Sequence, residues 1–280
     1  MAKNFTEVVN FTSKPQHSIT FVYQTKLHEI CQTVMVTWSK DRTDHSLCIT
    51  INNPSQKSAY SCKIDSIFKQ NWGKKGLKTL EIQGHRIDIF WDFRHAKFST
   101  VPQPLSNYYV ILVHKKETLL FLGDLQREAH ERARSSPCLE KNILLYKKET
   151  LHGKKMFCTK AMFEEGKEEH DIMIETSLSG PDDPEMWVSI DGVVATRIMN
   201  LNWRFRGNET VIVNNLPLHI LWDVHDWLFN GSGHGLFIFK PGSLESEEDD
   251  SDNGGDRDCC NEDKLNSQGC CHFLYAWNTN

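Results

Sequence analysis

The feature of this sequence that most constrains its fold is an internal repeat. Residues 71–98, shifted by 131 positions, fall on residues 202–229 without a gap, and eight of the 28 positions are identical. Coincidence is a poor explanation, because two of the identities are tryptophan pairs. A repeat of this kind favours two related modules. The identical pairs are Asn71/Asn202, Trp72/Trp203, Gly76/Gly207, Thr79/Thr210, Ile89/Ile220, Trp91/Trp222, Asp92/Asp223 and Phe98/Phe229.

Both copies have the pattern of antiparallel β-structure. Apolar and polar residues alternate in segments such as 33–38 and 87–92, which places one set of side chains on a buried face. The nearly unbroken apolar run 108–113 predicts a strand covered on both sides. Gln83-Gly84 and Asn214-Asn215 separate strand-like runs, as tight hairpin turns do. We therefore expect an all-β fold of two duplicated antiparallel modules, arranged as a sandwich or a barrel.

One helix is expected between the modules, at about residues 124–134. Asp124 is a candidate N-cap, and Glu128 and Arg132 have the spacing of a favourable ion pair on a helix. The predicted organisation is a first module at 17–123, a linking helix at 124–137, a second module at 138–241 and a disordered acidic tail at 242–280.

The charge of the chain is concentrated in that tail. Residues 245–264 contain ten acidic and two basic side chains, whereas the rest of the chain carries a net charge of +3. Acidic runs of this kind are typical of disordered segments. A body so close to neutral argues against nucleic-acid binding.

The sequence has no continuous apolar run of about 20 residues, so we expect no transmembrane segment. The first residues lack the apolar core of a signal peptide, and we expect a cytoplasmic location. A peripheral contact with a membrane or with an anionic ligand is left open.

Several stretches of the chain resemble a known plant family. The resemblance covers about residues 17–240 and is most specific at 203–208 and 222–229. It identifies the chain as similar to the plant family called domain of unknown function 868. The resemblance implies a plant origin and a shared fold, but no activity or catalytic residue, and the acidic tail lies outside it. The other matching stretches are 36–40, 74–76, 90–92, 96–98, 122–125, 128–129, 153–154 and 159–161.

The best candidate for a catalytic pair is His225 with Asp226, because a carboxylate can orient an imidazole for acid–base chemistry. The first copy has Arg94-His95 at these positions, so the pair is not repeated. What both copies keep is Trp-Asp. We interpret Trp91, Asp92, Trp222 and Asp223 as structural, with buried indoles and carboxylates that accept hydrogen bonds from a turn, and extend this to Trp72 and Trp203.

Basic residues occur at equivalent places in the two copies, at Lys74 and Lys75 and at Arg204 and Arg206. Alternation with aromatic residues is also what an ordinary amphipathic strand shows. One hypothesis is that the four side chains form a single surface for an anionic ligand or partner.

The cysteines near the end of the chain do not predict a metal site. Cys259-Cys260 and Cys270-Cys271 are adjacent pairs without the C-x-x-C spacing of zinc ligands. We expect no metal and no cofactor. Ser246 and Ser251 precede acidic residues, and phosphorylation is predicted there.

No strong catalytic or nucleotide-binding motif is present in the sequence. A non-enzymatic binding or interaction module with an unknown protein partner is therefore the leading prediction. The first alternative is a carrier that holds a small apolar ligand or lipid inside a β-barrel. The second alternative is an enzyme that uses the His225–Asp226 pair.

Overall fold

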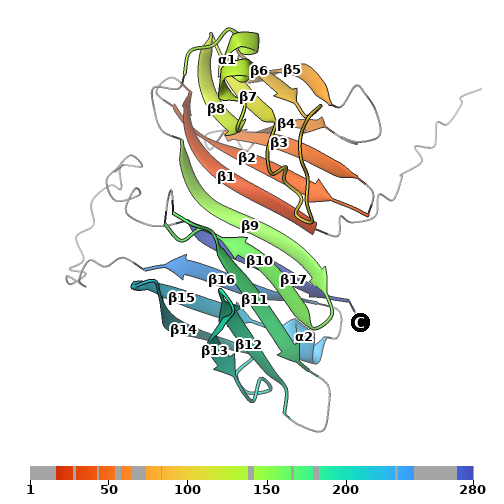
Figure 1. Cartoon of the computed structure of the whole chain (residues 1–280), viewed down its shortest axis with the longest axis vertical. Helices are drawn as coiled ribbons and strands as arrows, with labels where there is room; N and C mark the ends of the chain where they lie inside the picture. The colour runs from red at the N-terminus through yellow and green to blue at the C-terminus, as the bar shows by residue number, and fades with distance from the viewer. Residues whose placement is uncertain are drawn as a thin grey trace, which may run out of the picture.

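The computed structural model consists almost entirely of antiparallel β-structure with two short helices (Figure 1). The prediction of an all-β protein is confirmed, and the sheets are open and packed as sandwiches. The described residues are 17–27, 30–42, 44–53, 58–64, 74–82, 84–137, 142–164, 167–178, 183–230, 233–242 and 270–279.

A nine-stranded sheet runs the length of the molecule. Its strands follow the order β14-β15-β16-β17-β9-β1-β2-β3-β4, so it joins strands from both halves of the chain. All neighbours pair antiparallel except β17 and β9, which are parallel. The bounds are β1 (His17–Leu27), β2 (Ile30–Lys40), β3 (His45–Asn53), β4 (Ser58–Ile64), β9 (Ile143–Gly153), β14 (Arg206–Val213), β15 (Leu216–Asp223), β16 (His234–Pro241) and β17 (Cys271–Asn278).

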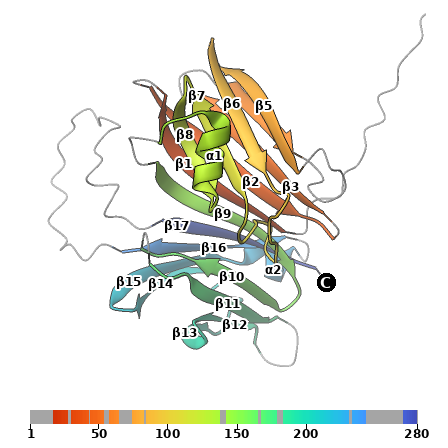
Figure 2. The same cartoon turned by 45° about the horizontal axis from the view of Figure 1, so that its top comes forward.

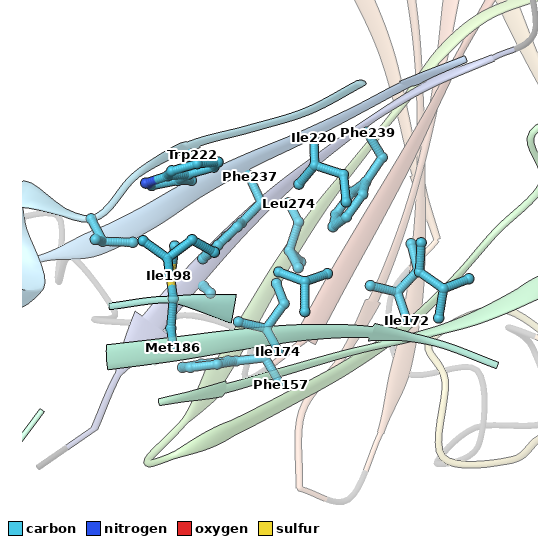
Figure 3. Packing of buried hydrophobic residues seen from close by; sticks show 14 of the residues in the cluster. Phe157, Ile172, Ile174, Met186, Ile198, Ile220, Trp222, Phe237, Phe239 and Leu274 are labelled. Carbon is cyan, nitrogen blue, oxygen red and sulfur yellow. The ribbon is translucent and has the colours of Figure 1, made fainter. Parts of the chain in front are cut away.

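Two four-stranded sheets pack against the nine-stranded sheet, one near each end (Figures 1 and 2). The first forms a core with β2–β4, and the second forms a core with β14–β17. Figure 3 shows the second core, in which Phe157, Ile174 and Met186 face Trp222 and Phe237. The first sheet contains β5 (Lys75–Ile82), β6 (His85–Asp92), β7 (Tyr109–His114) and β8 (Glu117–Gly123), and the second contains β10 (Met156–Ala161), β11 (His170–Ser177), β12 (Glu185–Ile190) and β13 (Val193–Ile198).

Both small sheets cover the same face of the large one. Glu149 of β9 lies opposite Ile19 of β1 and opposite Leu274 of β17 in the strand register. Side chains at opposed positions of paired strands point to one face of a sheet. Leu274 belongs to the second core, and Ile19 pairs with Trp38 of the first core. Glu149 therefore lies between the two cores.

The C-terminal region corrects one prediction. Residues 242–280 were expected to be a disordered tail, but Cys271–Asn278 is strand β17, inside the nine-stranded sheet between β16 and β9. Leu274 and Ala276 are fully buried. The alternation of buried and half-exposed positions along this strand is that of any core strand. The acidic residues 245–264 lie outside the described residues.

The linking helix α1 (Gln126–Ala133) packs on the outer face of the first small sheet, with Ala129 against Tyr109, Ile111 and Val113. Strand β7 is consequently buried at every position, as its apolar run predicts.

Two details of helix α1 differ from expectation. Asp124 does not cap the helix, because its carboxylate accepts hydrogen bonds from the N–H groups of Asn107 and Tyr108 (2.9 and 3.1 Å). The ion pair along the helix joins Arg127 and Glu131. Arg132 instead donates to carbonyl oxygens of the sheet beneath it. A second short helix, α2 (His225–Phe229), was not expected.

Candidate functional site

The repeated segment forms two hairpins of the same construction. Strands β5 and β6 correspond to β14 and β15 at the same displacement of 131 residues seen in the sequence. In each hairpin a glycine lies opposite the tryptophan, Gly76 opposite Trp91 and Gly207 opposite Trp222. A Cβ atom at either glycine would overlap the indole ring. Both indoles are buried, at 8% and 4% exposure.

The aspartates after these tryptophans also make equivalent contacts. Asp92 accepts a hydrogen bond from the N–H of Arg94 and pairs with Lys75 (3.1 and 3.4 Å). Asp223 accepts one from the N–H of His225 and pairs with Arg206 (3.1 and 2.7 Å). Each carboxylate thus links the turn that follows it to the neighbouring strand of its hairpin, which is a structural role.

The environment of Asp92 keeps its carboxylate ionised. Burial raises the pKa of Asp92, but the hydrogen bonds and charge of Arg94, together with Lys75, outweigh burial and leave the pKa below its usual value. The carboxylate is thus fixed as an acceptor, which suits a scaffold contact and does not suit a general acid at neutral pH.

The candidate catalytic pair has weak geometry. The Nδ1 atom of His225 lies 3.4 Å from Oδ1 of Asp226, and both side chains are 39% exposed. Hydrogen bonds from His225 and then from Asn230 lower the pKa of Asp226. The imidazole also lies against the rings of Phe205 and Phe229. The third group that contacts the pair is the amide of Asn230, which donates to Asp226 (2.7 Å), so the arrangement holds both side chains in place.

The four predicted basic residues do not form one surface. Lys75 lies on β5 and Arg206 on β14, at opposite ends of the molecule in Figures 1 and 2. Each of these two side chains is paired with the aspartate of its own hairpin. Arg204 lies over the ring of Trp222, and the backbone carbonyl of Lys74 accepts a hydrogen bond from Phe93. The hypothesis of a joint anionic docking surface therefore does not fit the structure.

Trp203 corrects the interpretation of the tryptophans. Its side chain is 88% exposed, so it is not part of the core. It lies in a tight turn, in which the N–H groups of Trp203 and Arg204 donate to the carbonyl of Asn200 (2.9 and 3.0 Å). An identity with Trp72 suggested burial, but residues in such turns point outward more freely than strand residues. Trp72 itself lies outside the described residues.

Trp203 is the most exposed of five apolar side chains on strands β13 and β14 and on the connection between them. Strands β13 and β14 are both edge strands, and Thr196 of β13 donates to Glu209 of β14 (2.7 Å). Half of the ten large apolar side chains that are exposed in the described residues lie between positions 193 and 212. We name this set the apolar edge, and its members are Val193, Val194, Met199, Trp203 and Ile212.

A buried polar cluster surrounds Glu149, where the two halves of the molecule meet. Glu149 is 2% exposed and interacts with four side chains from four strands. No sequence motif indicated this cluster, because its members are far apart along the chain. The contacts are to Nε2 of His17 on β1 (2.7 Å), Nζ of Lys147 on β9 (3.2 Å), Oγ1 of Thr159 on β10 (2.5 Å) and Nε2 of His272 on β17 (3.0 Å).

The cluster shifts the pKa values of Glu149 and His272. Burial raises the pKa of Glu149, but the hydrogen bonds from His17 and His272 and the charge of Lys147 hold it well below its usual value. Burial lowers the pKa of His272, which the bond to Glu149 only partly offsets. A neutral His272 donates through Nε2 to the carboxylate, which leaves Nδ1 as a bare acceptor without a partner among the described residues.

We expect stability to fall with acidification through this cluster. Below pH 6.5 His272 binds a proton more readily in the unfolded chain than in the folded chain, because folding lowers its pKa. Below pH 4.5 Glu149 likewise binds a proton more readily in the unfolded chain. Each group contributes up to about 1.4 kcal/mol per pH unit. Thermal unfolding followed by circular dichroism from pH 7 to 4 should show a shallower slope between pH 6.5 and 5 for His272→Gln. The exposed control His95→Gln should keep the wild-type slope, and an unchanged slope in His272→Gln would contradict the assignment.

Two clefts among the described residues are lined by charged side chains of both signs. One, of about 680 Å³, lies beside helix α1 and is lined by Lys75, Asp92, Arg94 and Arg132 among others. Another, of about 540 Å³, is lined by Glu164, Lys167 and Glu168 together with apolar residues of the β14–β15 hairpin. These linings do not match the apolar cavity of a lipid carrier.

The described residues contain no group of three or more His, Cys, Asp and Glu side chains that could hold a metal ion. In the same part of the chain, no helix has both the length and the apolar character needed to span a bilayer. The predicted phosphorylation sites Ser246 and Ser251 lie outside the described ranges, as do Cys259 and Cys260.

The fold defines a β-sandwich protein built around one long shared sheet. The chain belongs to a family described as plant protein of unknown function (DUF868), whose model matches residues 14–278. The match includes β17, so the family resemblance extends beyond residue 240, where it was expected to end. Comparisons with curated proteins and with solved structures found no match.

Proposed function

We propose that this chain is a non-enzymatic interaction module that binds a protein partner through the apolar edge. The observation that carries the proposal is the exposure of Trp203, at 88%, in the turn between two edge strands that carry Val193 at 70% and Ile212 at 68%. Large apolar side chains gathered on a surface are typical of binding sites, and tryptophan is enriched among residues that dominate binding energy.

The strand arrangement supports the same role. Among the described strands, β14 pairs only with β15 and β13 only with β12, so each has one side without a described neighbouring strand in its sheet. The unpaired N–H and C=O groups of an edge strand can accept an extended segment of another protein. We propose that an extended apolar segment of the partner pairs with β14 and packs on the side chains of the apolar edge.

The equivalence of the two hairpins supports a further part of the proposal, that the two halves arose by duplication. The first half has a tryptophan, Trp72, at the position of Trp203, but the apolar side chain at position 212 is a feature of the second half alone. The residue equivalent to Ile212 in the first half is Glu81, and the one equivalent to Val211 is Leu80. An edge that carries a charge at this position resists pairing with another strand.

The proposal predicts that Trp203→Ala separates binding from stability. Because the indole is in solvent, the free energy of unfolding should change by less than about 0.5 kcal/mol. Affinity for the partner should fall by about 30-fold or more, the usual effect of losing a central aromatic residue. The measurement is co-purification of partners from plant tissue by tagged protein, followed by titration of the recovered partner.

The matched control is Leu105→Ala, which removes another exposed apolar side chain, in the first half. It should leave both stability and partner recovery unchanged. Equal recovery of partners by wild type and Trp203→Ala would overturn the role of the apolar edge. Photo-crosslinking from position 212, compared with position 105, provides a second readout that does not depend on affinity.

A further inference from the structure

The nine-stranded sheet has one face that no other described helix or strand covers. Both small sheets pack on its opposite face, helix α2 adds Trp227 to the second core, and helix α1 lies beyond the first small sheet. In β17, Leu274 belongs to the second core, so the alternate residues Phe273, Tyr275 and Trp277 point away from it. Figure 2 shows strands β9, β17, β16 and β15 side by side in this part of the sheet.

Large apolar side chains form a continuous patch on the uncovered side. Phe273 lies opposite Ile238 and Tyr275 opposite Leu236, and opposed residues of paired strands share a face of the sheet. The ring of Tyr146 on β9 lies 5.5 Å from that of Phe273. These side chains are half-exposed and belong to none of the described hydrophobic cores. We name the patch the aromatic face, and its members are Tyr146, Leu236, Ile238, Phe273, Tyr275 and Trp277.

Two exposed lysines accompany the aromatic face. Lys148 of β9 lies opposite Phe273 in the register, and its Nζ atom is over the ring of Tyr275 (4.6 Å). Lys240 of β16 follows Ile238 by two positions, so both side chains point to the same side of the sheet. The patch thus combines apolar rings with ammonium groups.

Acidic side chains are nearly absent from the same strands. Strands β9, β15, β16 and β17 contain only two, Glu149 and Asp223. Glu149 lies on the core side of the sheet, and Asp223 is paired with Arg206 (2.7 Å). The chain as a whole carries a net charge of -5, so this basic patch is a local feature, and it favours an anionic partner.

The form of the surface favours a flat partner over a peptide. The four strands are paired along both sides, so their backbone groups cannot accept an added strand. Neither of the two clefts described above includes a member of the aromatic face. Tyrosine and tryptophan combine an apolar ring with a polar atom and are enriched where proteins meet the bilayer interface. Lysines beside such rings add attraction to anionic headgroups.

We propose that the aromatic face docks on the surface of a bilayer that contains anionic lipids. The rings and aliphatic side chains lie at the boundary between headgroups and acyl chains, and Lys148 and Lys240 pair with lipid phosphates. The contact is peripheral. It is independent of the protein partner proposed at the apolar edge, because Trp203 is not a member of the aromatic face.

The first test measures co-sedimentation of the full chain with lipid vesicles. We expect binding to phosphatidylcholine vesicles with about 30% phosphatidylserine, and binding at least about tenfold weaker to pure phosphatidylcholine. Lys148→Gln with Lys240→Gln should lower the partition coefficient on the anionic vesicles about 25-fold, since each lysine near such a surface contributes a factor of about five. The matched control is Lys115→Gln with Lys116→Gln, which removes the same charge from the exposed turn between β7 and β8 and should bind like the wild type.

The second test identifies the tryptophan that reaches the lipid. Anionic vesicles with brominated acyl chains quench the fluorescence of indoles that lie close to them. At a lipid concentration that binds all of the protein, Trp277→Phe should lose most of the quenching seen with the wild type, whereas Trp203→Phe should retain it. This comparison separates the aromatic face from the apolar edge.

Several results would overturn the proposal. Wild-type protein that binds no anionic vesicles, or binds both kinds of vesicle equally, would exclude the contact, and this result needs no variant to fold. Unchanged binding by the variant at Lys148 and Lys240, or quenching that depends on Trp203 instead of Trp277, would place the contact elsewhere. Binding of polyglutamate but not of vesicles, with loss in the same lysine variant, would assign the aromatic face to an acidic protein instead of a bilayer.

Discussion

Truncation of the chain after Gly242 is expected to unfold the second half of the molecule. The truncated chain lacks β17, so β9 and β16 each lose the strand between them. The core loses Leu274 and Ala276, which are fully buried. The expected loss of stability exceeds about 5 kcal/mol, which is comparable to the total stability of a typical domain. Circular dichroism and binding of a hydrophobic dye should show loss of the cooperative transition and an exposed core.

The buried charge adds to the effect of this truncation. Without His272, one oxygen of the Glu149 carboxylate loses a hydrogen bond while Glu149 stays beside Lys147. An incompletely satisfied buried charge costs several kcal/mol. The control is the replacement of residues 243–269 by Asn-Gly, which removes the same acidic segment but keeps β17. This control should melt within a few degrees of the wild type, whereas a truncated chain that melts like the wild type would show that β17 is dispensable.

The sequence predicted the hairpins better than any other part of the fold. The period of two in residues 85–92 and 216–223 places Trp91 and Trp222 on the buried face, as the structure has them. The turn chemistry was also correct, because Gly84, Asn214 and Asn215 have positive φ angles. Strand alternation and turn residues depend on neighbouring positions in the sequence, so the sequence alone could predict these hairpins.

The sequence analysis did not predict strand β17, because the acidic residues before it dominate the composition of this region. In residues 271–278 the aromatic residues Phe273, Tyr275 and Trp277 alternate with His272, Leu274 and Ala276, which is a period of two, as in a strand. The acidic run before it suggested that the whole segment stays in solvent, since composition averages over a window that is longer than one strand. Its parallel pairing with β9 joins residues more than 100 positions apart, and no local pattern specifies such a pairing.

The candidate sites were hard to predict for the same reason, because contacts between residues far apart in the sequence leave no local pattern. The Glu149 cluster combines His17, Thr159 and His272, and only the topology brings these strands together. The identity with Trp72 led to the prediction that Trp203 is buried. In the structure Trp203 lies in the turn after Asn200 and its side chain is exposed to solvent. Single residues far from regular strands therefore need the structure before a role can be assigned to them.

The second large effect is expected when either buried indole of the repeated hairpins is removed. Trp222→Ala and Trp91→Ala should each lower the free energy of unfolding by about 3–5 kcal/mol, the usual cost of deleting a large buried ring. The two losses should be similar, because the two rings pack against equivalent glycines in the two cores. Chemical denaturation followed by circular dichroism measures both, and a small effect at one site only would show that the two environments differ in energy.

The glycine opposite each ring provides a sharper test of the same packing. A methyl group at Gly207 would overlap the Trp222 ring, so Gly207→Ala alone should cost about 1–3 kcal/mol, as overpacking does. In the Trp222→Ala background the ring is absent and the added methyl has room, so Gly207→Ala should then be nearly neutral. The double-mutant cycle should give a coupling of about 1–3 kcal/mol, since the two residues are in contact. Additive effects would mean that the glycine is required for backbone conformation instead of for space, and the same cycle at Gly76 and Trp91 would decide whether the first half relies on the same contact.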